Sequence, residues 1–477
     1  MFSNQDLEQI TAHGIDPKSV EQQINYFEQG FPSLPVLRAA AVGDGILRLS
    51  DSEMREAIAA YESARSELKV VKFVPASGAA TRMFKELFEF VGADKRTPGI
   101  DYLLQNIEKF AFYPELKALL PEGADDKATV SAIIGEGLAY GSKPKGLVTF
   151  HSYEDGNRKA IEEHLVEAAT YGSNNGEANI HFTVSPEHRA AFIELLDAVV
   201  PRHEAKYGVK FHISFSEQSP ATDTVAVNPD NTLFRTNSGS LLFRPAGHGA
   251  LLENLNAIDA DLIFIKNIDN VTTDALRADT VAYKKALAGT LLKIQDQAFE
   301  YIKALAVGGA ELEPIAQFIE EKLCVKVPTN YGSAILTSIL ERPMRVCAMV
   351  RNEGEPGGGP YWVKDAEGFE SLQIAESSQI SAEDAHLMSE ATHFNPADLI
   401  CAVKDSRGNK FNLKEFVDYS TGFISEKSSE GRPLRAQELP GLWNGSMAKW
   451  NTIFIEVPVS TFSPVKIVQD LLRPQHQ

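Results

Sequence analysis

Apolar and polar positions alternate along the chain in two distinct patterns. Short apolar runs rich in β-branched residues predict strands at 70–74, 146–150, 178–184, 209–215 and 262–268. Longer mixed stretches with helical spacing lie between these runs. Because strands that alternate with helices form βαβ units, the pattern predicts an α/β protein with a mostly parallel sheet.

The pattern also predicts helical additions to this core. The first sixty or so residues are predicted as helices joined by polar linkers, and a helix is expected to begin at Ser50–Glu53. Further strands are expected at 345–350, at Trp362 and at 372–374. We therefore expect an N-terminal helical segment over residues 1–68. One domain over 69–477 is expected to follow, with helical insertions at about 84–138 and 272–340.

Composition and charge narrow the class of partner. The 477 residues include 46 Lys and Arg against 65 Asp and Glu, so the net charge is −19. This balance argues against a nucleic-acid partner or an anionic membrane, because both require basic surface. The 3 cysteines form no paired motif, and no apolar run is long enough to span a bilayer. The expectation is a cytoplasmic protein, and the sequence leaves its oligomeric state open.

The turn after the predicted strand 70–74 carries the first candidate chemistry. The strand breaks at Pro75, passes through Ser77, Gly78, Ala79, Ala80 and Thr81, and leads into a helix predicted at 84–88. Such a turn directs backbone N–H groups and a helix dipole at one point, which suits a phosphate. Arg82 adds a permanent cation. The alternative is an ordinary turn in which Arg82 pairs with Glu86 across one helical turn.

Two further strings carry candidate residues. Gly247 and Gly249 flank His248 before a helix, which lets the backbone approach a flat ligand such as a base. The apolar strand 262–268 runs into Asp269, and ligands of open α/β sheets gather at the carboxyl ends of strands. Asp269 is therefore a candidate metal or phosphate residue, with a solvated turn acid as the alternative. The pair Asp259 and Asp261 precedes the strand, at the wrong end for a site.

These strings together resemble the uridylyltransferases that make UDP-sugars from UTP and sugar 1-phosphates. Residues 245–249 with 267–270 carry the resemblance, and residues 457–472 are similar to the closing motif of the family, which is the most specific match. Other matches follow the order of the family from residue 70 to the end, at 77–83, 142–148, 215–220, 376–378 and 393–395. The loop at 76–80 lacks the double glycine of the family, and a long helical stretch separates Arg82 from Lys145. The chain thus resembles a divergent bacterial branch of unknown function.

The resemblance implies a three-layer α/β/α nucleotide-diphospho-sugar transferase (GT-A-like) fold. It also implies Mg²⁺-dependent transfer of a nucleotidyl group from a nucleoside triphosphate, UTP in the first instance, to a sugar 1-phosphate. This reaction needs charge neutralisation and alignment rather than a protein nucleophile. The expected catalytic residues are Arg82 at the β- and γ-phosphates, Lys145 near the α- or β-phosphate and Lys466 at the sugar phosphate. The other expected ligands are residues 77–81 for the triphosphate, Asp269 for Mg²⁺, Gln218, Gly247, His248 and Gly249 for the base, and Glu376 and Asn395 for the sugar.

Alternatives stay open at the level of residues and of function. Lys145 is also interpretable as a solvated loop charge, Gln218 as a strand cap, and Glu376 and Asn395 as surface residues. The rival functions are a non-catalytic nucleotide or nucleotide-sugar binding protein and a glycosyltransferase. The altered glycines favour the binding protein, and Arg82 argues against the glycosyltransferase, because a UDP-sugar needs less positive charge than a triphosphate. A Lys145 side chain within reach of Asp269 would favour the nucleotidyltransferase.

Overall fold

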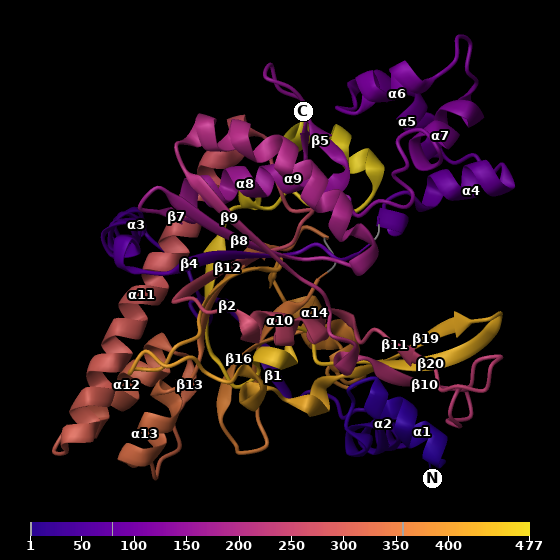
Figure 1. The fold of residues 1–477 in the computed structure, drawn as a ribbon. Helices are drawn as coiled ribbons and strands as arrows, with labels where there is room; N and C mark the ends of the chain where they lie inside the picture. Colours follow the sequence, from indigo (N-terminus) through magenta and orange to yellow (C-terminus); the bar gives the residue numbers. More distant parts are fainter. Residues whose placement is uncertain (1, 79, 355–356) are drawn as a thin grey trace. The chain divides into compact units, whose positions relative to one another are not determined.

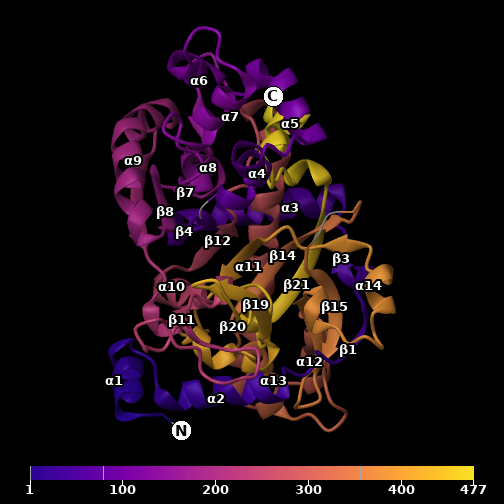
Figure 2. The same ribbon diagram turned by 90° about the vertical axis from the view of Figure 1, so that its right-hand side faces the viewer.

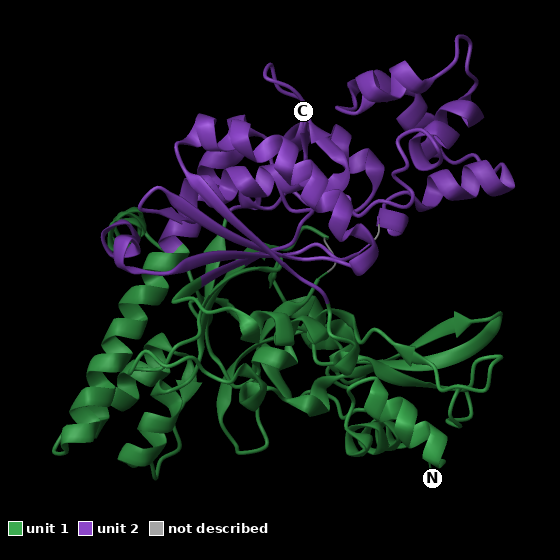
Figure 3. Cartoon of the chain, in the orientation of Figure 1, with its two compact units in different colours: residues 1–60, 218–262, 287–457 green, residues 61–217, 263–286, 458–477 purple. Residues whose placement is uncertain are grey.

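The computed structural model describes residues 2–78, 80–354 and 357–477. The chain forms two compact units, drawn in two colours in Figure 3. Unit 1 comprises residues 1–60, 218–262 and 287–457, and unit 2 comprises residues 61–217, 263–286 and 458–477. The division expected at residue 68 stays a prediction, because compactness alone defines these units.

Unit 2 is built on strands whose hydrophobic runs were evident in the sequence. Its strand order is β12-β4-β8, with β9 and β7 pairing with β8, and β4, β8 and β9 run parallel. Every residue of β12 is buried, as expected for a central strand. Helices α8 and α9 pack together and against β8 and β9 (Figure 1). The strands are β4 (Val70–Pro75), β5 (Thr149–His151), β6 (Arg158–Lys159), β7 (Ser173–Asn174), β8 (Glu177–Thr183), β9 (Lys210–Ser216) and β12 (Leu262–Lys266), and these two helices are α8 (Ala160–Tyr171) and α9 (Pro186–Tyr207).

The stretch 84–138 of unit 2 is helical, as expected. It contains α4 (Lys85–Ala93), α5 (Pro98–Gln105), α6 (Tyr113–Leu119) and α7 (Asp126–Ile134). These helices share a hydrophobic cluster with Val465, Val468 and Leu471 near the end of the chain. Figure 2 shows α4, α5 and α7 near the C-terminus. This apolar contact holds the segment 458–477 in unit 2.

Unit 1 contains three groups of strands. The first has the order β2-β3-β21-β14-β18, with β17 also pairing with β14, and the others have the orders β1-β15-β16-β13 and β11-β10-β20-β19. Its strands are β1 (Val36–Ala39), β2 (Ala41–Val42), β3 (Gly45–Leu47), β10 (Thr224–Val227), β11 (Phe243–Arg244), β13 (Val325–Lys326), β14 (Met344–Arg351), β15 (Gly359–Lys364), β16 (Glu370–Ala375), β17 (His393–Phe394), β18 (Asp398–Ala402), β19 (Phe423–Ser429), β20 (Arg432–Glu438) and β21 (Asn451–Val457). Its helices are α1 (Asn4–Ala12), α2 (Pro17–Gln29), α10 (Leu252–Ala257), α12 (Leu312–Lys322), α13 (Ser333–Leu340) and α14 (His386–Glu390). Helices α3 (Asp51–Ala64) and α11 (Arg277–Val307) contribute residues to both units.

The expected fold class is confirmed. Parallel pairings join β14 to β21, β21 to β3 and β4 to β8, while β14 and β18 run antiparallel, so the protein is α/β with a mixed, mostly parallel sheet. Helix α3 begins where expected, since Ser50 and Glu53 cap its start through reciprocal hydrogen bonds. Among the residues that the structure describes, no helix is both long enough and apolar enough to cross a bilayer.

Two local expectations were wrong. The first sixty residues are not only helical, because residues 36–47 contain β1, β2 and β3. These strands are too short to show a period of two, and pairing with β15 and β21 decides their conformation. The strand expected at 146–150 starts later, since Lys145–Leu147 forms a 3₁₀ turn before β5. Lys145 is the first residue of that turn.

Candidate functional site

Three side chains from distant parts of unit 2 converge at the end of β12. Asp269 follows this strand and is 7% exposed. Lys145 Nζ donates hydrogen bonds to Asp269 Oδ2 at 2.6 Å and to the Val465 carbonyl oxygen at 2.7 Å. Lys466 Nζ lies 3.9 Å from the same Asp269 oxygen. Asp269 is thus not a solvated turn acid, and Lys145 is not a solvated loop charge.

Backbone contacts place Lys466 beside this carboxylate. The Val465 N–H donates to the Asp269 carbonyl oxygen at 3.1 Å, and the Ser463 N–H donates to Asn270 Oδ1 at 2.9 Å. The Asp470 carboxylate accepts hydrogen bonds from the backbone N–H groups of Lys466 and Ile467. The segment that carries Lys466 is therefore aligned against the residues that follow β12. Sequence reasoning missed Asn270 as a contact residue, although it singled out the string that contains it.

The electrostatics of this group suit an anion. Two ammonium groups face one carboxylate, which leaves a net positive charge, and the Lys466 side chain is 52% exposed. Charge-assisted contacts of this kind bind phosphate oxygens well. No set of three or more His, Cys, Asp or Glu side chains among the described residues is arranged to hold a metal ion. A single carboxylate fits Mg²⁺ only where substrate phosphates complete the coordination.

The candidate phosphate loop lies in the same unit. The Ala80 N–H donates to the Lys143 carbonyl oxygen at 3.0 Å, and Ser185 Oγ donates to the Ser77 carbonyl oxygen. These bonds tie the loop to the stretch before Lys145 and to the start of α9. Thr81 is exposed, Gly78 has open space around its Cα, and Ala79 lies outside the described residues.

The end of this loop leads into the expected helix. Residues 80–82 form a 3₁₀ turn, and α4 begins at Lys85, one residue after the start of the helix expected at 84–88. Arg82 is exposed and forms no ion pair or hydrogen bond within the part of the chain that the structure describes. Glu86, its expected alternative partner, accepts a hydrogen bond from Gln469 instead. The Arg82 guanidinium is therefore accessible to a ligand.

Lys143 is a further cation near the loop. It lies within the matched segment 142–148, but no role was expected for it from the sequence. Its ammonium lies 5.8 Å from the centre of the Tyr140 ring. Burial and the nearby Lys159 charge lower the pKa of Lys143. Its position before Lys145 makes it a second basic group next to the loop.

The residues expected to bind the base lie in unit 1. Gly247 has a φ of +74°, and a Cβ there would come within 2.5 Å of Glu438 Oε2, so only glycine fits. His248 stacks on Trp443 with ring centres 4.3 Å apart, and its Nδ1 accepts a hydrogen bond from the Leu442 N–H. Burial lowers the pKa of His248 to about 4. His248 is therefore a neutral, stacked ring and a poor general base.

Gly249 lines a cavity of about 440 Å³ in unit 1, together with Asp223 and Tyr419. Gln218 Nε2 lies 3.5 Å from Asp223 Oδ1, so Gln218 contacts one residue of the cavity wall. The structure thus connects Gln218 to the side of this cavity.

Glu376 and Asn395, the expected sugar ligands, both lie near Gly358 of unit 1. A Cβ on Gly358 would come within 3.2 Å of Glu376 Oε1, and the Asn395 N–H donates to the Gly358 carbonyl oxygen. Asn395 is 6% exposed, and its amide bonds the Ala348 carbonyl oxygen and the Ala397 N–H. Asn395 is therefore not a surface residue, and its side chain organises the backbone after β17.

Comparisons with known proteins give a family and a fold. A family model described as a domain of unknown function (DUF4301) matches residues 3–477. No curated protein matches the chain in sequence. A structure of UDP-N-acetylglucosamine pyrophosphorylase from Trypanosoma brucei matches with a TM-score of 0.54 and 12% identity, covering 99% of this chain and 79% of that one. This match shows that the chain has the UDP-sugar pyrophosphorylase (nucleotidyltransferase) fold.

Two further structures match with lower scores. A UDP-glucose pyrophosphorylase mutant from Leishmania major in complex with UDP-glucose has a TM-score of 0.46 and 14% identity, over 99% of this chain and 79% of that one. A UDP-glucose phosphorylase from Trypanosoma brucei has a TM-score of 0.47 and 12% identity, over 98% and 77%.

Proposed function

The chain belongs to the DUF4301 family, and from its nucleotidyltransferase fold and its basic site we propose that it transfers a nucleotidyl group to a sugar 1-phosphate. The donor is a nucleoside triphosphate, UTP in the first instance, because the matched fold is that of a UDP-sugar pyrophosphorylase. The single observation that carries the proposal is the 2.6 Å contact of Lys145 with Asp269, with Lys466 at 3.9 Å. A Lys145 side chain within reach of Asp269 is the arrangement that was expected to favour the nucleotidyltransferase, so the contact supports the proposal.

The reaction is an in-line exchange at phosphorus. An oxygen of the sugar 1-phosphate forms a bond to the α-phosphorus, and the bond from that phosphorus to the bridging oxygen of the β-phosphate breaks. Pyrophosphate leaves with the electron pair, so no protein nucleophile is needed. Lys145 would offset charge at the α- or β-phosphate, and Lys466 would hold the sugar phosphate. The loop at 77–81 and Arg82 would bind the β- and γ-phosphates.

Asp269 would hold Mg²⁺ together with substrate phosphates. Bound Mg²⁺ neutralises phosphate charge. Asp269 fits this role because one carboxylate at a strand end is enough when the nucleotide supplies the other oxygens. Lys145 would then turn its charge from Asp269 to the phosphates.

The remaining assignments concern unit 1. Gln218, Gly247, His248 and Gly249 would surround the base, and the cavity that Gly249 lines, with Gln218 in contact with its wall, supports this assignment. Glu376 would bind sugar hydroxyls. Asn395 would act there mainly by holding the adjacent backbone.

A non-catalytic nucleotide-sugar binding protein is the second candidate function. One observation favours it, because the loop at 76–80 lacks the double glycine of the uridylyltransferases that the chain resembles. Such a protein would bind the nucleotide and release no pyrophosphate.

Pyrophosphate release tests both candidates. Each nucleoside triphosphate is combined with Mg²⁺ and a panel of sugar 1-phosphates, using wild type, Asp269→Ala and the matched control Asp261→Ala. We expect release for one specific pair, loss in Asp269→Ala and no change in Asp261→Ala. Binding of a nucleotide in a thermal-shift assay without any release would instead establish the binding protein. A protein that releases no pyrophosphate and binds no nucleotide would overturn both candidate functions.

A further inference from the structure

Helix α8 is buried along most of its length, yet it carries several ionisable side chains. Glu163, His164 and Glu167 are each 0% exposed. Burial of charged or polar groups is costly unless they are paired, and apolar residues of similar size would be cheaper. The partners of these three side chains therefore indicate what the helix does beyond packing.

All three side chains contact the stretch of chain that carries Asp269. Glu167 Oε1 accepts a hydrogen bond from Lys266 Nζ at 2.7 Å, before Asp269. His164 Nε2 lies 3.1 Å from the Ile268 carbonyl oxygen, in the peptide that joins Ile268 to Asp269. Glu163 accepts from Arg277, which also donates to the Thr272 carbonyl oxygen at 2.8 Å, after Asp269. The helix therefore contacts this stretch on both sides of Asp269.

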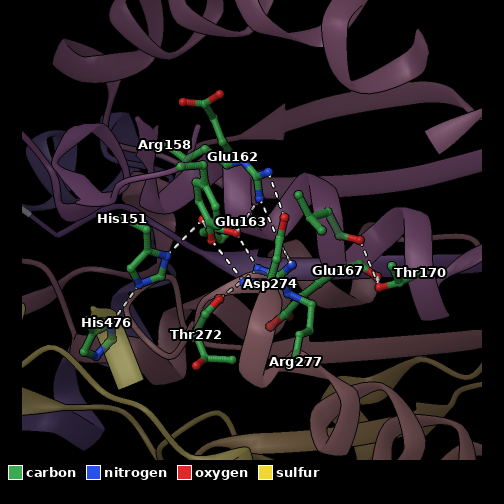
Figure 4. Close-up of polar contacts among 12 residues, drawn as sticks. His151, Arg158, Glu162, Glu163, Glu167, Thr170, Thr272, Asp274, Arg277 and His476 are labelled. Carbon is green, nitrogen blue, oxygen red and sulfur yellow. Dashed lines mark hydrogen bonds and ion pairs between the residues drawn. The ribbon is translucent and has the colours of Figure 1, made fainter. Parts of the chain in front are cut away.

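Glu163 is the centre of a charge-balanced cluster, drawn in Figure 4. Arg158 donates two hydrogen bonds to Asp274, and Arg277 bonds both Asp274 and Glu163. Two guanidinium groups thus balance two carboxylates. Such planar, charge-assisted contacts have a defined geometry, so they fix the chain that follows Asp269 in direction as well as in distance.

The His164 side chain makes a single hydrogen bond among the described residues, and the direction of this bond is determined. A carbonyl oxygen can only accept, so Nε2 carries the proton. Burial lowers the pKa of His164 well below its usual value, so the ring is neutral and Nδ1 has only a lone pair. Nδ1 is buried with no hydrogen-bond partner among the described residues. Packing alone would therefore favour an apolar side chain at this position.

We propose that His164 is a positioning residue for Asp269, which it holds through the Ile268 carbonyl oxygen. The role of Asp269 as a ligand rests on the proposed function, but the mechanical link does not. Asp269 in turn contacts Lys145 through its side chain and the Val465 N–H through its carbonyl oxygen. Loss of the His164 bond frees the Ile268–Asp269 peptide to rotate, and this rotation loosens both contacts.

Hydrogen exchange tests the link without any ligand. The amides of Val465 and Ser463 report on it, because they donate to Asp269 and Asn270. We expect His164→Leu to speed exchange of these two amides at least tenfold. His164→Gln, which retains an N–H donor, is expected to stay within about threefold of wild type. His164→Met carries the same expectation as His164→Leu if the leucine variant does not fold.

His203→Leu is the matched control. His203 is 2% exposed, it contacts Glu162 through Nε2, and its Nδ1 also has no partner among the described residues. We expect this control to leave the Val465 and Ser463 amides unchanged. Unchanged exchange in both apolar His164 variants, or equal acceleration in His203→Leu, would overturn the inference.

Kinetics separate this inference from the proposed function. In an active protein, His164→Leu is expected to lower kcat at least tenfold, to leave KM for the sugar 1-phosphate within twofold, and to be largely rescued by glutamine. A wild-type protein without activity would overturn the proposed function alone, because the exchange result does not depend on turnover. An active protein in which His164→Leu retains full kcat would overturn the positioning role.

Discussion

Lys145 and Asp269 are 124 positions apart in the sequence, and the Lys145 ammonium donates a 2.6 Å hydrogen bond to the Asp269 carboxylate. The same ammonium also binds the Val465 carbonyl oxygen. One side chain thus connects a turn before β5, the end of β12 and the segment that carries Lys466. A phosphate that enters this site would compete with Asp269 for Lys145.

Removal of the Lys466 side chain should lower activity and leave stability nearly unchanged. We expect Lys466→Ala to lower kcat/KM for the sugar 1-phosphate by about 10- to 100-fold, the value of one charge-assisted contact. The free energy of unfolding should change by less than about 0.5 kcal/mol, because the side chain is half exposed. Steady-state kinetics and urea unfolding measure the two effects. Lys85→Ala, which removes a more exposed lysine, is the control, and an equal loss of activity there would contradict the prediction.

Arg82→Ala should weaken binding of a triphosphate more than binding of a monophosphate. The guanidinium is exposed and has no ion-pair partner among the described residues, so its loss disturbs no internal contact. We expect the Kd of UTP to rise about tenfold and that of UMP to stay within twofold, with partial rescue by Arg82→Lys. Calorimetric titration measures both constants. Arg407→Ala removes another exposed arginine as the control, and a proportional loss of UMP binding would refute the assignment to the distal phosphates.

Acid should destabilise the protein through His476. Its Nδ1 lies 2.8 Å from Nε2 of His151, which contacts Glu163 (Figure 4). Burial, with smaller effects of His151 and Arg473, lowers the pKa of His476 to about 3, against a usual value near 6.5. The unfolded chain therefore takes up the proton first, so the free energy of unfolding falls as pH drops from 6.5 towards 3 and is unaffected above 6.5.

The matched variant for this effect is His476→Gln, which does not titrate. Between pH 6.5 and pH 5, wild type should lose about 1.6 kcal/mol more than the variant. Urea unfolding across this range measures the difference. Parallel pH profiles for the two proteins would be inconsistent with a buried neutral His476.

Glu167 should be important for stability because it lies between two buried lysines. Its carboxylate contacts Lys72 and Lys266, which are 0% and 1% exposed. Glu167→Ala leaves two buried ammonium groups without a counterion and should cost about 3 to 5 kcal/mol. The triple variant Lys72→Met, Glu167→Leu, Lys266→Met should regain most of the lost free energy of unfolding, since apolar packing avoids burial of charge. Denaturant unfolding tests both variants, and a loss below about 1 kcal/mol for Glu167→Ala would exclude a buried ionised triad.

Local sequence was sufficient to predict the elements that lie around the site. The run Val70–Val74 is apolar enough to be a strand in any α/β protein, and it is one. The strand before Asp269 was equally clear, because the run Leu262–Ile265 is apolar and suits a buried central position. Hydrophobic period and composition are local properties, so they predict a strand even when the segments that pack against it are unknown. The short strands at 36–47 have no such period, and only pairing defines them.

Contacts between distant segments were beyond sequence patterns. Nothing in the string Glu162–Glu167 distinguishes a solvated helix face from a buried one, and only the packing of α8 shows that Glu163, His164 and Glu167 are buried.

The sequence by itself determined the α/β class, the strand that precedes Asp269 and the identity of the charged residues Lys145, Asp269 and Lys466. Side-chain chemistry and hydrophobic period are local properties of the sequence, so they can be read from it directly. Only the tertiary structure decided that Lys145, Asp269 and Lys466 meet, and that α8 supports them from a buried position. The physical reason is that an ion pair and a desolvated hydrogen bond depend on distance and burial. Both quantities are set by how segments more than a hundred residues apart pack together.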